Sequence, residues 1–82
     1  MGNLFYDEPR SKADVHTWTH KVLDPTAYCG EGDFCFASGK RGPIIGNPQW
    51  IILTQRGEII RQYMRADRVR EMTREEFEVA NG

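Results

Sequence analysis

Short runs of apolar residues bounded by polar ones are typical of β-strands, and two such runs lie near the middle of the chain. Residues 50–54 (WIILT) and 59–64 (IIRQYM) are rich in β-branched and aromatic residues, which favour an extended backbone. Four residues, Gln-Arg-Gly-Glu, separate them, and Gly57 can adopt the positive φ that a tight reversal requires. The sequence therefore predicts a β-hairpin over residues 50–64.

Two registers are open for this hairpin. A two-residue turn pairs Thr54 with Ile59. A type I turn with Gly57 in a bulge instead pairs Thr54 with Glu58. We predict the second register, because Arg56 is poorly suited to the first positive-φ position of the two-residue turn.

Both faces of the hairpin are apolar. Alternation places Trp50 and Ile52 on one face, and it places Ile51 and Leu53 on the other. A surface sheet would be apolar on one face only. We therefore expect the hairpin at the centre of the fold, covered on both sides or wrapped into a small barrel.

Residues 14–23 (DVHTWTHKVL) alternate in the same way and predict a first strand. The side chains that strict alternation places on one face are those of His16, Trp18, His20 and Val22. Pro25 ends this strand, because proline has no backbone N–H to donate to a neighbouring strand.

Glycine and proline dominate the connection that follows. Residues 28–37 predict either a second hairpin or a loop that leads into a strand. Residues 38–48 (SGKRGPIIGNP) contain three glycines and two prolines, which predicts an irregular connection with Ile44 and Ile45 anchoring it to the core. A connection of this length is long for so small a domain, and long loops often carry function.

The end of the chain is highly charged. Residues 65–72 (RADRVREM) predict a short edge strand or a charged turn. Thr73 and Glu76 form a capping-box pattern, in which each side chain bonds to the other residue's backbone N–H. A short helix over about 74–80 should follow, with Phe77 as its apolar anchor.

These elements predict an α+β, mainly β fold: a small antiparallel sheet or partly open barrel of four to five strands, built on the central hairpin, with a short C-terminal helix. The 82 residues are enough for a single small domain, residues 1–82. Residues 1–13 contain one apolar cluster, formed by Leu4, Phe5 and Tyr6. This segment is either folded onto the domain through that cluster or a loose arm whose aromatic rings contact a partner.

Charge is unevenly distributed along the chain, although the net charge is only −1. Residues 1–37 contain three Lys and Arg against six Asp and Glu, residues 38–72 seven against three, and residues 73–82 one against three. The basic middle is either a contact surface for an anionic partner or part of an internally paired charge pattern, which is the commoner case. The N-terminus lacks a basic start, and no apolar stretch exceeds four residues, so we expect a cytoplasmic protein without membrane contact.

Four residues carry the donor types of a tetrahedral zinc site: His16, His20, Cys29 and Cys35. Their spacing argues against such a site, because residues i and i+4 of a strand lie about 13 Å apart. A disulfide between Cys29 and Cys35 is geometrically feasible but runs against a reducing cytoplasm. We expect two reduced thiols in the core instead, and no bound cofactor.

The basic middle also holds the strongest candidate contact residues, which are Lys40, Arg41, Arg61, Tyr63, Arg65 and Arg68. Arginine and tyrosine are typical of the residues that dominate protein interfaces. The same residue types bind single-stranded nucleic acid through phosphate contacts and base stacking. Glycine-flanked Lys40 and Arg41 lack the spacing of a phosphate-binding Walker loop, which favours a flexible basic turn.

Little in the sequence supports catalysis. Neither Ser11 nor Ser38 lies in a nucleophile-elbow pattern, and so short a chain offers little depth for a substrate pocket. We therefore expect a non-enzymatic binding module that acts stoichiometrically on a larger protein, as an adaptor, regulator or inhibitor. The alternative is a nucleic-acid-binding module that uses the basic region 38–72, with or without zinc.

Overall fold

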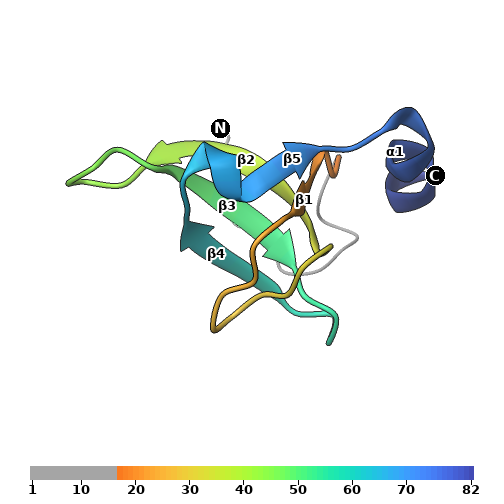
Figure 1. The fold of residues 1–82 in the computed structure, drawn as a ribbon, viewed down its shortest axis with the longest axis horizontal. Coiled ribbons are helices and arrows are strands. Elements are labelled where there is room, and N and C mark those ends of the chain that lie inside the picture. Colours follow the sequence, from red (N-terminus) through yellow and green to blue (C-terminus); the bar gives the residue numbers. More distant parts are fainter. Residues whose placement is uncertain (1–16) are drawn as a thin grey trace, which may run out of the picture.

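The computed structural model describes residues 17–82, which form one antiparallel sheet and a short C-terminal helix (Figure 1). The strands are β1 (His20–Val22), β2 (Phe34–Arg41), β3 (Pro48–Leu53), β4 (Ile59–Tyr63) and β5 (Val69–Glu71). Their order in the sheet is β4-β3-β2-β1-β5. The 3₁₀ helix η3 (Ala66–Arg68) precedes β5, and α1 (Arg74–Asn81) ends the chain. The predicted fold class is confirmed, while the arm predicted over residues 1–13 and His16 lie outside the described residues.

The central hairpin consists of β3 and β4, and its register is the predicted one. The Thr54 N–H donates to the Glu58 carbonyl at 2.8 Å, and the Gly57 N–H donates to the Thr54 carbonyl at 2.9 Å. Gly57 has a φ of +87°, a backbone conformation that is strained in residues with a side chain. Leu53 lies opposite Ile59, so the tight turn begins directly after this pair.

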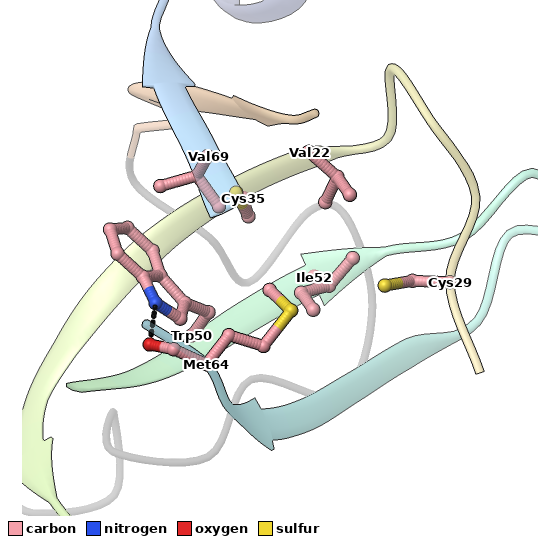
Figure 2. Close-up of a cluster of buried hydrophobic side chains, with 7 residues drawn as sticks. All are labelled: Val22, Cys29, Cys35, Trp50, Ile52, Met64 and Val69. Atoms are coloured by element: carbon pink, nitrogen blue, oxygen red, sulfur yellow. Dashed lines mark hydrogen bonds between the residues drawn. The ribbon is translucent and has the colours of Figure 1, made fainter. Parts of the chain in front are cut away.

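The strand β3 is buried on both faces, as its apolar pattern predicts. The prediction that the whole hairpin lies at the centre of the fold was wrong, because β4 is an edge strand whose Arg61 and Tyr63 side chains are exposed. Ile51 and Ile52 point to opposite sides of β3 and are both fully buried. One face packs into the core cluster shown in Figure 2, formed by Val22, Cys29, Cys35, Trp50, Ile52, Met64 and Val69. Within it, the Trp50 indole N–H donates to the Met64 carbonyl at 3.0 Å, which satisfies the one polar atom of that buried side chain.

The opposite face of the sheet is covered by aromatic rings. The ring centroid of Trp18 lies 5.7 Å from that of Phe36, which is the register partner of Ile51. By contrast, the His20 ring lies 5.1 Å from Trp50, on the core-cluster face. The prediction that Trp18 and His20 share a face was therefore wrong. The strand β1 begins only at His20, because the backbone N–H and C=O of Trp18 bond to the side chain of Asn81 in α1 at 2.7 and 2.8 Å.

The glycine-rich connection is shorter than predicted. Residues 28–33 form a loop that leads into β2, and β2 continues through Arg41, which pairs with Pro48. The pairing of β2 with β3 shifts register between Ala37 and Arg41, and Gly39 adopts a positive φ within this stretch. Only residues 42–47 form the loop, and the prediction that it is anchored to the core was wrong.

The charged C-terminal region contains both predicted alternatives, a 3₁₀ turn followed by the edge strand β5. The capping box is confirmed: the Glu76 N–H donates to the Thr73 hydroxyl at 3.2 Å, and the Thr73 N–H donates to the Glu76 carboxylate at 2.9 Å. The buried residue of α1 is Ala80, whereas Phe77, the predicted anchor, is exposed.

Candidate functional site

The loop of residues 42–47, which we call the β2–β3 tip, projects from the sheet at the left of Figure 1. Its conformation is closed by internal hydrogen bonds. The Gly42 N–H donates to the Asn47 carbonyl at 2.8 Å, and the Arg41 guanidinium donates to the Gly46 carbonyl at 2.9 Å. The Tyr63 ring lies close to Gly42, since a Cβ at Gly42 would come within 3.5 Å of it. The tip is therefore braced by β2 and β4.

Two large apolar side chains on this loop are exposed to solvent. Ile44 is 93% exposed and Ile45 is 80% exposed. Burial of an isoleucine side chain stabilises a fold by about 1.5–3 kcal/mol. Neither Ile44 nor Ile45 makes this contribution. The two residues are therefore not part of the core cluster.

Positive charge surrounds this apolar pair. Lys40 and Arg41 are exposed at the end of β2, and no acidic residue occurs between Ser38 and Pro48. Among residues 17–82, no carboxylate forms an ion pair with either cation. The structure thus gathers three of the predicted contact residues, Lys40, Arg41 and Tyr63, around the tip.

The other predicted contact residues lie elsewhere. Arg61 is exposed on β4, on the same face as Tyr63 two positions later. Arg65 pairs with Asp67 at 2.6 Å, next to η3. Arg68 ends η3, and its carbonyl accepts from the Leu23 N–H at 2.8 Å. These last two arginines belong to the η3 connection rather than to the tip.

The interpretation of internal charge pairing holds for part of the basic region. Arg70 makes two hydrogen bonds to the Glu76 carboxylate, at 2.7 and 2.6 Å, and Lys21 approaches the same group at 3.4 Å. Arg65, also in this region, pairs with Asp67 at 2.6 Å. Paired cations of this kind are partly neutralised, which leaves the tip as the more distinctive basic site.

The predicted metal ligands do not form a centre within the described residues. His16 lies outside them, and among residues 17–82 no group of three or more His, Cys, Asp or Glu side chains could hold a metal ion. The His20 Nδ1 atom is 2.7 Å from the Thr19 hydroxyl instead. Cys29 and Cys35 are both buried and not joined by a disulfide, as expected for reduced thiols in the core.

Comparison with known proteins gives no relative. No protein-family model, no curated protein and no solved structure matches this chain. None of the helices formed by residues 17–82 is long and apolar enough to cross a membrane. The function must therefore be argued from the chemistry of the surface.

Sequence reasoning missed the main feature of the site. It selected the cations and Tyr63 but assigned Ile44 and Ile45 to the core because they are apolar. The sequence signal that could have found them is their position between Gly42-Pro43 and Gly46, a composition typical of a turn at the surface.

Proposed function

We propose that this chain is a small non-enzymatic binding module that acts stoichiometrically on a larger protein through the β2–β3 tip. The observation that carries this proposal is the near-complete exposure of Ile44 and Ile45 on a loop braced by its own hydrogen bonds. The proposal includes no cofactor. It also places the protein in the cytoplasm, as the sequence leads us to expect.

The physical argument is one of preorganisation. A loop already closed by hydrogen bonds loses less conformational entropy on binding than a mobile one. Burial of the two isoleucine side chains in a partner then contributes most of its transfer free energy to affinity. Exposed Tyr63 and Arg41 beside them belong to the residue types that most often dominate such interfaces.

The charge of the tip indicates the chemistry of its partner. A protruding apolar pair fits a pocket better than a flat surface, and Lys40 and Arg41 favour carboxylates around its rim. We therefore infer an apolar pocket with acidic residues at its edge. Exposed rim charges of this kind mainly accelerate association and orient the two proteins.

A nucleic-acid-binding module remains the second candidate, because Tyr63 is exposed and lies on β4 close to Arg61. Two features disfavour it. The net charge is −1, and isoleucine side chains neither stack on bases nor contact phosphates favourably. A salt titration separates the candidates, since nucleic-acid affinity falls steeply with ionic strength through counterion release, whereas an apolar protein contact changes much less.

A quantitative pull-down from the native host tests the proposal. The baits are the wild-type protein, an Ile44→Ser, Ile45→Ser double variant and a Val79→Ser control, in which an equally exposed apolar residue of α1 is replaced. We expect one protein to be captured near one-to-one by the wild type and the control, and at least tenfold less by the double variant. The free energies of unfolding of the three baits should agree within about 0.5 kcal/mol, because the replaced side chains lie at the surface.

Two results would count against the proposal. Equal capture by all three baits would show that the tip is not the contact surface. Nuclease-sensitive capture that disappears at moderate salt would favour the nucleic-acid candidate instead.

A further inference from the structure

A second candidate site lies at the other end of β3. A cavity of about 410 Å³ opens between residues 26–30 of the β1–β2 loop and residues 54–58 of the β3–β4 turn. Pro48 begins β3 beside the tip and Leu53 ends it beside this turn, so the cavity and the tip are separated by the length of the strand. Nothing in the proposed function uses this cavity.

A buried carboxylate forms part of its wall. Asp33 is only 5% exposed, and its Oδ2 atom accepts a hydrogen bond from the Gly30 N–H at 2.8 Å. Among residues 17–82, no donor bonds to the Oδ1 atom. Asp33 is one of the residues that line the cavity, so its carboxylate can accept a hydrogen bond from a donor that enters.

The remaining lining fits a cation. Glu58 adds a second carboxylate and Arg56 one guanidinium, so the charged side chains of the wall sum to −1 and a single positive charge would neutralise them. The exposed ring of Tyr28 offers an aromatic face, which attracts ammonium and guanidinium groups. The Cys29 thiol, which also lines the cavity, lies 3.3 Å from the Thr26 hydroxyl.

We propose that this cavity binds an alkylammonium or guanidinium group, with Asp33 as the principal acceptor. The group is the end of a lysine or arginine side chain from another polypeptide, or of a free amine of the same chemistry. The site is independent of the β2–β3 tip, so either can fail without the other.

The direct test is an NMR titration of the ¹⁵N-labelled wild-type protein with n-butylammonium chloride. We expect saturable amide shifts at residues 28–33 and 54–58, which surround the cavity, and no comparable shifts in the tip. Sodium butyrate at equal ionic strength is the matched control and should produce no saturable change. Shifts that do not saturate, or that butyrate reproduces, would overturn the proposal whatever the variants show.

A pair of variants then tests the role of the buried carboxylate. Asp33→Asn keeps an oxygen acceptor for the Gly30 N–H but removes the charge, and it should weaken butylammonium binding at least tenfold. Glu31→Gln removes an exposed charge from the same loop outside the cavity lining, and it should change the affinity less than twofold. If Asp33→Asn does not fold, Glu58→Gln replaces it, with a loss of at least threefold expected. Unchanged affinity in the folded variant would contradict the assignment.

Two further probes identify the source of the cation. Tighter binding of the capped peptide Gly-Lys-Gly than of butylammonium would assign the cavity to a polypeptide side chain. Tighter binding of spermidine would assign it to a free polyamine. Both results support a cation site, whereas failure of all three amines to bind would remove it.

Discussion

At the scale of single residues, the two thiols illustrate how position in the sheet determines chemistry. Cys35 is fully buried on β2, within the core cluster. Burial raises the pKa of its thiol to about 12, and the negative charges of Cys29 and Asp33 act in the same direction. Cys35 therefore stays protonated at neutral pH and acts as a small apolar core residue rather than a nucleophile or metal ligand.

This raised pKa predicts a loss of stability in alkaline solution. Below the ordinary thiol pKa of 9.0 the contribution of Cys35 is fully present. As the pH rises from 9.0 towards 12, the thiol ionises in the unfolded chain but not in the folded one, which favours unfolding. At pH 10.5 the loss relative to pH 8 should reach about 2 kcal/mol.

Urea unfolding of the wild type and of Cys35→Ala at both pH values measures this loss. Other groups ionise in the same pH range in both proteins. The difference between the wild type and the variant therefore isolates the effect of the Cys35 thiol. The wild type should lose about 2 kcal/mol more than the variant between pH 8 and pH 10.5. Parallel losses in the two proteins would show that Cys35 ionises freely in the folded state.

At the scale of elements, α1 is fixed to the sheet mainly by polar contacts. Glu76 completes the capping box that begins the helix and also bonds to Arg70 on β5 and Lys21 on β1. At the other end of the helix, Asn81 bonds to the backbone of Trp18. One carboxylate thus both starts the helix and holds it against two strands, while Figure 1 shows α1 standing at the edge of the sheet.

The stability contributed by Glu76 should depend on pH in the acidic range. The Arg70 guanidinium, helped by the Thr73 N–H, holds the pKa of the Glu76 carboxyl far below its ordinary value of 4.5. A lowered pKa stabilises the fold above pH 4.5, and this contribution is lost as the pH falls below that value and the unfolded chain takes up the proton. The melting temperature of the wild type should therefore fall between pH 6 and pH 3.

Glu76→Gln should melt lower than the wild type at pH 6 and should lose less on acidification, because the ionised group is gone. Glu75→Gln is the matched control on the adjacent, exposed position of α1 and should behave as the wild type does. Circular dichroism measures the melting temperature of all three proteins at both pH values. An equal fall in all three would show that Glu76 does not hold the helix.

What the sequence could predict at this scale was local. The central hairpin and the capping box depend on residues within a few positions of one another, and both are as predicted. The face of Trp18 depends on Asn81, 63 positions away, and composition and periodicity do not report such long-range contacts, so this feature required the structure. The exposure of Ile44 and Ile45 follows from the nearby pairing of Arg41 with Pro48, and it was missed because apolar residues were assigned to the core.

At the scale of the whole molecule, the sheet separates two surfaces of different chemistry. The β2–β3 tip presents apolar side chains with positive charge beside them, and the cavity at the far end of β3 presents a buried carboxylate. Both surfaces lie on loops, whereas the buried residues of β2 and β3 between them provide a rigid support. This arrangement suits a module that contacts its partners at its ends rather than across the sheet.

The six isoleucines of the chain allow the most direct test of the claim that the tip is the contact surface. They divide into Ile44 and Ile45 on the tip, Ile51 and Ile52 buried in β3, and Ile59 and Ile60 half-buried on β4. The measurement is a ¹³C-methyl NMR spectrum of the isoleucine δ1 groups, recorded before and after addition of the partner captured by the wild-type bait. We predict that the Ile44 and Ile45 signals shift or broaden while the Ile51 and Ile52 signals stay in place. Unchanged Ile44 and Ile45 signals, with changes at Ile59 and Ile60 instead, would contradict the account.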